Sequence, residues 1–191
     1  MKNLNLTGQF LIAMPSMTDP RFSQTITYIC THNEDGAMGI VINRPSHHTV
    51  ADLFAQIQLS AKPGPLLKHP IYEGGPVQQE RGFVLHTPHQ EYDATITINE
   101  SLSLTTSKDI LEAAANNDAP EKMMIALGYA GWSAGQLEQE MGLNAWLSLE
   151  ASEQQTIHNI IFDEPPANRF HLGMGIMGLN LSNLSDIAGH A

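Results

Sequence analysis

The residue types most able to do chemistry in this chain are the thiol of Cys30 and the imidazole of His32. Side chains two residues apart on a β-strand share a face, so the sequence predicts that these groups are neighbours. A nearby imidazole stabilises the thiolate, and the reactive interpretation predicts that the native thiol alkylates faster than a free thiol. A lone cysteine in an apolar strand is also typical of a small buried hydrophobic residue, so both interpretations stay open.

A second candidate nucleophile is Ser133, in the segment Gly131-Trp-Ser-Ala-Gly135, which fits the G-x-S-x-G pattern of a nucleophile elbow. Asp163 and His171 follow it in the order serine, acid, histidine. The segments before it are predicted to form hairpins, whereas a hydrolase of that fold needs several βα units. Two glycines at a tight turn from a strand into a helix explain the pattern as well. The sequence favours this structural role.

Two further patterns are rejected as binding sites. The segment 173–178 fits G-x-G-x-x-G, but a dinucleotide site needs a following helix and strand, with an acidic residue about 20 positions further on. The pairs His47-His48 and His86/His89 lack the spacing of ligands held on one helix face, and a single cysteine cannot complete a zinc set. We therefore expect surface or loop histidines, no metal and no cofactor.

These residues must be positioned by a mixture of hairpins and helices. The runs Thr25–His32 and Met38–Asn43 are joined by Asn33-Glu-Asp-Gly36, which predicts a β-hairpin. Other strands are expected at Phe10–Met14, Gly82–Thr87, Ala94–Ile98, Leu102–Thr105, Met123–Ala130 and Ala145–Leu149. Helices are expected from Thr49, over 107–115 with Ser107 as cap, over 133–141, and in part of the C-terminal region, broken by Pro165 and Pro166. With no repeat and no linker, the chain is predicted to be a single α+β domain over residues 1–191.

The bulk charge restricts the kind of partner. Twenty acidic against nine basic residues give a formal net charge of −11 over 191 residues. Such a surface repels phosphate backbones, so direct nucleic-acid binding is not expected. The apolar stretch near the N-terminus, Phe10-Leu-Ile-Ala-Met14, is too short for a signal sequence or a membrane span. The cytoplasm is the expected compartment, with no membrane partner.

Several ordered motifs resemble those of the AlgH/YqgE family over essentially the whole chain. They are Phe10-Leu-Ile-Ala-Met-Pro15, Asp19-Pro-Arg-Phe22, Tyr28-Ile-Cys-Thr-His-Asn33, Gly36-Ala-Met-Gly39, Asn43-Arg-Pro45, Gly74-Gly-Pro-Val77, Arg81-Gly-Phe-Val-Leu-His86, Gly128-Tyr-Ala-Gly-Trp132, Gly135-Gln-Leu-Glu138 and Ala188-Gly-His-Ala191. One departure is Phe170 after Arg169, where relatives often carry tryptophan.

The resemblance implies a compact fold of mixed, largely antiparallel β-sheets with flanking helices. It implies no established reaction. The family name is linked to a proposed role in regulating alginate production, but the chain has no helix-turn-helix pattern, so regulation through a protein or small-molecule partner is expected. In the family the serine position of the elbow admits other residues, which argues against a nucleophile.

The preferred hypothesis is a cytoplasmic regulatory module that binds a small molecule or protein near the Cys-x-His hairpin. Polar groups that close short apolar strands, and turns that let a ligand approach the backbone, favour this position. Its candidate ligand-binding residues are Asp19, Phe22, Cys30, His32, Asn43, Arg44, Gly74, Gly75 and Trp132. The alternatives are an enzyme that uses Cys30 or, with less support, Ser133, and a thiol redox sensor.

Overall fold

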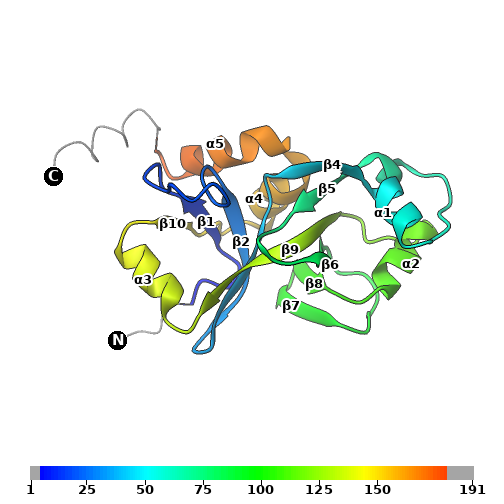
Figure 1. Ribbon diagram of the computed structural model, residues 1–191, viewed down its shortest axis with the longest axis horizontal. Helices are drawn as coiled ribbons and strands as arrows, with labels where there is room; N and C mark the ends of the chain where they lie inside the picture. The colour runs from blue at the N-terminus through cyan, green and yellow to red at the C-terminus, as the bar shows by residue number, and fades with distance from the viewer. Residues whose placement is uncertain (1–4, 180–191) are drawn as a thin grey trace.

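In the computed structural model, which describes residues 5–179, the long strand β9 (Met123–Ser133) is the element to which most of the fold is attached. Its C-terminal end pairs antiparallel with β3 (Gly36–Val41), and its N-terminal half pairs antiparallel with β6 (Val77–His86). The short strand β5 (Pro70–Glu73) joins it in parallel. Figure 1 shows β9 crossing the middle of the molecule between the two groups of strands.

The hydrogen-bonded strands follow the order β10-β1-β2-β3-β9-β6-β8-β7, with β4 attached through β5. The strands not yet given bounds are β1 (Phe10–Ala13), β2 (Ile26–Asn33), β4 (Pro45–Thr49), β7 (Thr95–Asn99), β8 (Leu102–Thr105) and β10 (Trp146–Leu149). Every pairing except that of β5 with β9 is antiparallel. The predicted α+β class, with mixed and largely antiparallel sheets in one compact domain, is confirmed.

The predicted strands are present, and their ends differ by a few residues. The hairpin of β2 and β3 is confirmed, as is that of β7 and β8. The strands β4 and β5 were not predicted because both are short and begin with a proline, and β4 is also polar. Proline is tolerated at the first position of a strand, where it removes no internal ladder bond.

The helices surround the sheet at its ends and on one side. They are α1 (Val50–Gln56), η1 (Pro65–Lys68), α2 (Asp109–Ala115), α3 (Gln136–Gly142), α4 (Gln154–His158), the π-helix η2 (Asn159–Asp163) and α5 (Pro166–Ile176). Thr49 caps α1 and forms a capping box with Asp52, as the predicted start requires. The prediction that Ser107 caps α2 is wrong. Lys108 holds the cap position, and the Ser107 hydroxyl donates to the Asp109 carboxylate at 2.5 Å.

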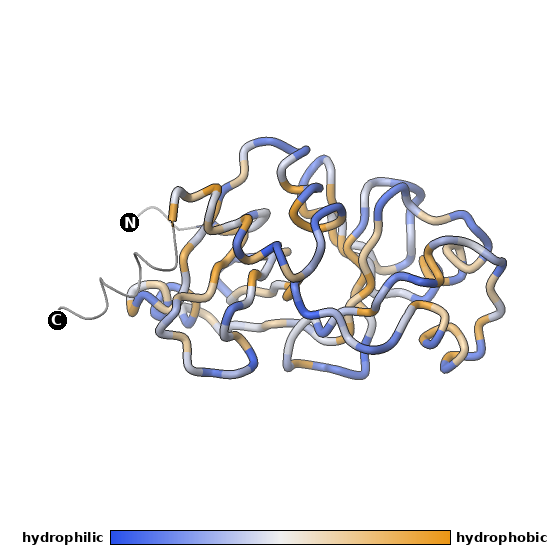
Figure 2. The backbone as a smooth tube through the Cα atoms, turned by 90° about the horizontal axis from the view of Figure 1, so that it is seen from above, coloured by the Kyte–Doolittle hydropathy of each residue, from blue (hydrophilic) through white to orange (hydrophobic). Residues whose placement is uncertain are grey.

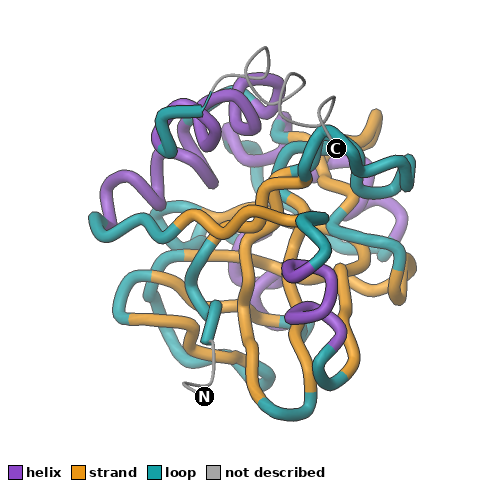
Figure 3. Tube along the Cα trace, turned by 90° about the vertical axis from the view of Figure 1, so that its left-hand side faces the viewer, coloured by secondary structure: helices purple, strands orange, loops and turns teal. Residues whose placement is uncertain are grey.

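The C-terminal helices lie together over one side of the strands, which Figure 3 shows from the end of the molecule that carries α3. Pro166 begins α5, where a missing backbone N–H breaks no helical bond, so the predicted break at the two prolines is confirmed. Gly173 lies within α5 and packs against the side chains of Ile12 and Ile26. Part of the 173–178 glycine pattern therefore serves close packing of a helix on strands.

Apolar side chains gather in three buried clusters. The first lies between the central strands and the C-terminal helices, the second beneath α3, and the third against α1 and α2. Figure 2 shows hydrophobic positions along the inner segments of the backbone and hydrophilic stretches in the outer loops. Between residues 5 and 179, none of the helices has the length and apolar character needed to cross a bilayer.

Candidate functional site

The predicted pairing of Cys30 with His32 on one strand face is wrong, because a β-bulge separates them. The register of β2 against β3 shifts between Ile29 and Thr31, so Cys30 is an extra residue in the ladder. A bulge reverses the alternation of side chains along a strand. Cys30 therefore packs in the first cluster, whereas His32 contacts residues beside the second.

The Cys30 thiol is enclosed by apolar side chains. Only 1% of the residue is exposed, and burial raises the pKa of its thiol, since a thiolate loses its hydration there. Among the described residues, its one polar contact is with the carbonyl oxygen of Tyr28, at 3.7 Å. The predicted thiol chemistry at Cys30 has neither access to a substrate nor a stabilised thiolate.

The His32 ring is fixed between the N-terminal segment and α3. Its Nδ1 accepts from the Leu6 backbone N–H at 3.1 Å, and its Nε2 lies 3.0 Å from the Glu138 carboxylate. Because Nδ1 accepts, the neutral ring carries its proton on Nε2 and donates it to Glu138. No acid for this ring was predicted, although Glu138 belongs to one of the motifs that carry the family resemblance. His32 here joins two segments of the fold.

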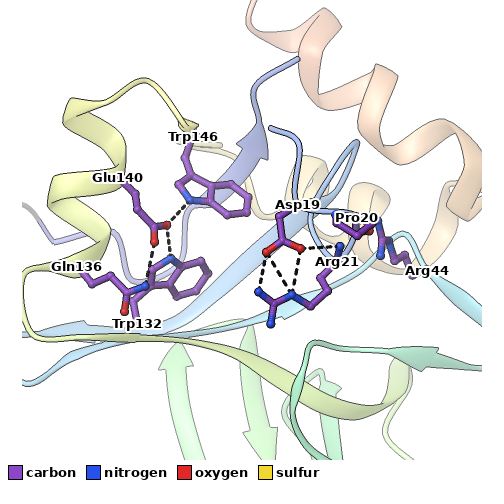
Figure 4. Close-up of polar contacts among 8 residues, drawn as sticks. All are labelled: Asp19, Pro20, Arg21, Arg44, Trp132, Gln136, Glu140 and Trp146. Atoms are coloured by element: carbon purple, nitrogen blue, oxygen red, sulfur yellow. Dashed lines mark hydrogen bonds and ion pairs between the residues drawn. The ribbon is translucent and has the colours of Figure 1, made fainter. Parts of the chain in front are cut away.

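Asn43 and Arg44 hold the loop between β1 and β2 in place. The Arg44 guanidinium donates to the backbone carbonyls of Pro20 and Ser23, at 2.8 and 3.0 Å. The Asn43 amide accepts from the Ile26 N–H and donates to the Gln24 carbonyl. In Figure 4 the Arg44 side chain reaches Pro20 at the base of this loop. These contacts brace the loop, and both residues also line a small depression of about 290 Å³.

The other predicted residues of this loop point in different directions. Asp19 binds Arg21 with both carboxylate oxygens, and this hydrogen bonding lowers the pKa of the Asp19 carboxyl group. Phe22 packs instead toward Trp132 and Trp146, with ring centroids 6.4 and 5.5 Å away. Asp19 and Arg21 form an exposed ion pair, while Phe22 closes an aromatic cluster.

This aromatic cluster is anchored by one carboxylate. Oε2 of Glu140 accepts the indole N–H groups of both Trp132 and Trp146, at 2.9 and 2.8 Å, and Oε1 accepts from Gln136 at 2.9 Å. Figure 4 shows Glu140 on α3 pointing to the two indoles, which come from β9 and from β10. Trp132 is thus a buried structural contact between α3 and the sheet.

Gly74 and Gly75 lie where the chain leaves β5 and passes against β9. A Cβ atom at Gly75, whose φ is +152°, would lie 2.1 Å from the carbonyl carbon of Tyr129. The backbone of Gly74 donates to Leu127 and accepts from Val41. Both glycines permit close contact between strands. Among the nine predicted residues, Phe22 and Trp132 are the pair whose rings lie side by side. The ligand-binding role of the nine residues stays a prediction.

Ser133 lies at the end of β9 and has no histidine as a hydrogen-bond partner within residues 5–179. Its hydroxyl and its backbone N–H donate to Oε1 of Gln136, at 3.1 and 3.0 Å. Asp163 pairs with Lys122 elsewhere in the molecule. Ser133, Asp163 and His171 line three different depressions. The arrangement is that of a turn into α3, as the structural interpretation predicts.

His86 also differs from the expectation of a surface or loop position. It ends β6 and is buried, with Nδ1 donating to the Thr87 carbonyl at 2.8 Å and Nε2 2.7 Å from the Thr105 hydroxyl. Burial, more than the weaker repulsion from His89, lowers the pKa of His86. The ring is a satisfied, neutral core histidine.

A cavity of about 580 Å³, here called the Arg169 cavity, is lined by none of the residues of the Cys-x-His hairpin. Its walls come from the region of η1, from β5, from the loop between α2 and β9, from the start of β9, and from η2 and α5. This volume lies in the range of sites that enclose small molecules. The sequence did not predict it, because its walls come from segments far apart in the chain.

Arg169 lines the cavity as a buried cation. The residue is 2% exposed, and within residues 5–179 no carboxylate lies within ion-pair distance of its guanidinium. It donates to the carbonyls of Ile42 and Glu164, at 2.5 and 2.9 Å, and to the Tyr72 hydroxyl at 3.2 Å. Burial lowers the pKa of Arg169, because the charged form loses hydration.

A signal for Arg169 is present in the sequence but was not used. It is one of nine basic residues, and it lies beside Phe170 in a helix that also contains Leu172 and Met174. An arginine in such an apolar stretch is typically buried. Because burial of an unpaired charge is unfavourable, a buried arginine usually has a structural or functional role. Pattern alone does not say what the guanidinium contacts.

The remaining polar groups of the cavity lie nearer its edge. Lys122 and Asp163 form an ion pair at 2.5 Å, and the Asp163 side chain is 41% exposed. Glu121 is exposed and also lines the opening. Between these groups and Arg169 the walls are formed mainly by apolar side chains from β9 and η2. The cavity therefore has one buried cationic end, an apolar body and an acidic edge.

Comparisons with known proteins give a consistent result. Residues 10–182 match the model of a family described as AlgH-like. The chain is 53% identical over all 191 residues to the "UPF0301 protein" of Thiobacillus denitrificans, covering 100% of both chains. It is 50% identical to "UPF0301 protein RSc0675" of Ralstonia nicotianae, covering 98% of this chain and 96% of that one. These names specify neither a ligand nor a reaction.

Two solved structures resemble the fold. The solution structure of the AlgH protein from Pseudomonas aeruginosa has a TM-score of 0.78 and 47% sequence identity, covering 100% of this chain and 98% of that one. The crystal structure of protein DIP2367 from Corynebacterium diphtheriae has a TM-score of 0.61 at 23% identity, covering 79% of this chain and 78% of that one. The second comparison bears on the fold alone.

Proposed function

The chain belongs to the AlgH-like family, and on that premise we propose that it is a binding module whose small-molecule ligand occupies the Arg169 cavity. Family membership specifies no reaction, and the geometry of the cavity supports the binding role. The observation that carries it is a buried guanidinium that lines a cavity of about 580 Å³ and has no carboxylate partner within residues 5–179.

Burying a cation without an anion is unfavourable, and a structural role alone does not require an adjoining cavity. An arginine used only to tie carbonyls together can be covered by packed side chains, as a satisfied polar core group is. Here Arg169 is only 2% exposed but borders a cavity, and one of its five N–H groups has no acceptor among residues 5–179. A ligand that enters the cavity would supply the missing contacts, and the concave, mostly apolar wall with few polar groups is typical of small-molecule sites.

This proposal moves the binding site away from the Cys-x-His hairpin. Burial of the Cys30 thiol and the contacts of Arg44 with Pro20 and Ser23 favour a structural role for that region. A regulatory role through the ligand, the cytoplasmic location and the absence of direct nucleic-acid contacts stay predictions from the sequence.

The test is a fragment screen by two-dimensional NMR, with neutral, cationic and anionic members. We expect chemical-shift changes to concentrate at Met123, Ile161 and Phe162 on the cavity wall. They should disappear in Ala119→Trp, which fills the cavity from its loop, and persist in Ala51→Trp, an exposed position on α1. Fragments that bind equally well to both variants, or no binding by any fragment, would contradict the proposal.

A further inference from the structure

The Arg169 cavity presents two hydrogen-bond donors without acceptors at its buried end. Nη2 of Arg169 carries two N–H groups, and among residues 5–179 its one acceptor is the Tyr72 hydroxyl, at 3.2 Å. That hydroxyl accepts from Arg169, so its own hydrogen is left to donate, and no described residue accepts it. Arg169 is 2% exposed and Tyr72 6%, and both line the cavity.

Two adjacent donors, one of them charged, match the two oxygens of a carboxylate. Charge-assisted hydrogen bonds from a guanidinium to a carboxylate are among the stronger polar contacts in proteins. The three other N–H groups of Arg169 contact the carbonyls of Glu164 and Ile42 and, more weakly, the Met124 sulfur, which fixes the direction of the fork. The pair is therefore available to an anionic group that enters the cavity.

The charge balance of the cavity favours a single negative charge. Arg169 is the one arginine or lysine lining it that makes no ion pair within residues 5–179, since Lys122 is paired with Asp163, and the charges of Glu164 and Asp163 act on Arg169 only from a greater distance. Glu121 adds a negative charge at the opening. A phosphate monoester, with about −1.5 to −2 charges at neutral pH, would meet one guanidinium and an acidic edge. A monocarboxylate meets a matched charge.

The apolar side chains that line most of the cavity favour a ligand with an apolar part. Met123, Ile125, Ile161 and Phe162 line it between the buried end and the edge, together with Leu66 from η1. Methionine and phenylalanine side chains adapt to flexible hydrocarbon and aromatic groups, and methionine does so with little strain. A ligand that fills this part gains free energy with each methylene removed from water.

We propose that the Arg169 cavity binds an amphipathic monocarboxylate, with the carboxylate on the Arg169 and Tyr72 donors and an aliphatic or aromatic body along the β9 and η2 wall. This inference rests on the proposed function and adds the chemical class of the ligand. Both sources of such a compound, a free fatty acid and an aromatic acid, share this chemistry.

Isothermal titration calorimetry with the full chain tests the charge and the tail separately. Along the series butanoate, hexanoate and octanoate, affinity should rise roughly fourfold for each added methylene, the factor that corresponds to about 0.8 kcal/mol. Octanamide, which has the same tail and no charge, should bind at least about tenfold more weakly than octanoate. Phenylbutanoate in the same assay separates an aromatic from an aliphatic body.

Two variants locate the charge effect. Tyr72→Phe removes one donor and keeps the ring, so octanoate should bind roughly tenfold more weakly while octanamide changes less. Arg169→Lys removes the fork and should weaken octanoate binding more strongly. The matched control is Arg81→Lys, which changes an exposed arginine outside the cavity and should leave affinity unaltered.

The calorimetric results distinguish the carboxylate proposal from the proposal of a binding cavity. Octanoate binding that exceeds octanamide binding and is weakened roughly tenfold in Tyr72→Phe supports the inference, and Arg169→Lys adds to it if that variant folds. Equal affinity for octanoate and octanamide, sensitive to Ala119→Trp, would overturn the carboxylate class while leaving the cavity as a binding site. Binding of octanoate that is unchanged in Ala119→Trp, or no binding of any fragment, would overturn both proposals.

Discussion

At the scale of single residues, the chemistry of Cys30 is decided by its surroundings and not by its neighbour in sequence. The bulge in β2 places the thiol in the apolar cluster and the His32 ring on the opposite face. A register shift of this kind leaves no signature in a strand of β-branched and aromatic residues. The shared-face prediction was sound for a regular strand and failed at the one extra residue.

The first prediction concerns the reactivity of this thiol. Because burial raises the pKa of Cys30 and covers it, native protein should react with iodoacetamide far more slowly than free cysteine at neutral pH. This reverses the reactive interpretation of the sequence. Mass spectrometry of the alkylated protein measures the rate, and concentrated guanidinium chloride should restore the rate of a free thiol. Fast labelling of the folded protein would refute the burial of Cys30.

His86 provides a pH dependence at the same scale. Burial lowers its pKa in the folded state below the value of about 6.5 in the unfolded chain, so the unfolded state takes up the proton first as pH falls. Its contribution to stability is therefore complete above about pH 6.5 and is lost as pH falls toward the folded pKa. Urea denaturation between neutral and mildly acidic pH should show this loss.

The comparison variant for this pH effect is His86→Gln, which removes the titrating ring. Its free energy of unfolding should fall less steeply over the same pH range, even if the variant is less stable at neutral pH. His47→Gln, at an exposed position, should keep the wild-type slope. Equal slopes for the wild type and His86→Gln would show that His86 does not carry the effect.

At the scale of elements, α3 is joined to the sheet through the Glu140 carboxylate. Three donors from β9, β10 and α3 itself converge on this one side chain. The sequence predicts the helix and both strands but not their connection, because a glutamate on a short amphipathic helix is ordinarily a solvated residue. The contact depends on a tertiary arrangement that periodicity does not encode.

Replacing Glu140 by leucine should therefore destabilise the protein by more than a surface change does. Two buried indole N–H groups lose their acceptor, at about 1–3 kcal/mol for each buried group left unsatisfied. Urea denaturation followed by tryptophan fluorescence measures the loss. Glu140→Gln keeps an acceptor oxygen and should recover part of the stability, and Gln139→Leu at an exposed position of the same helix should change it by less than about 0.5 kcal/mol. Equal stability of the Glu140→Leu and Gln139→Leu variants would disprove the anchoring role.

At the scale of the whole molecule, the fold was predictable and the cavity was not. Hairpins and capped helices follow from local patterns, such as the Asn33–Gly36 turn and the Thr49 capping box. The Arg169 cavity is formed where η1, β9, η2 and α5 come together, and no local sequence pattern predicts this tertiary arrangement. The predicted site followed family motifs, and the structure shows that Arg44, Trp132 and Gly75 among them make contacts that hold the fold together.

At the same scale, the acidic surface bears on the role of the buried Arg169 guanidinium in ligand binding. A formal charge of −11 repels anions from most of the surface, so an anionic ligand needs a site where a cation lies close to it and outweighs this repulsion. Arg169 is such a cation, because it lies inside the molecule beside apolar walls. Selectivity for an apolar body over a highly charged one follows from the same arrangement.

The most direct test of the central claim is a crystal structure of the full chain with octanoate. We predict that the carboxylate lies within hydrogen-bond distance of Arg169 Nη2 and the Tyr72 hydroxyl, with the tail along Met123 and Phe162. Octanoate bound outside the cavity, or bound inside it with its carboxylate turned to the edge near Lys122, would contradict the account.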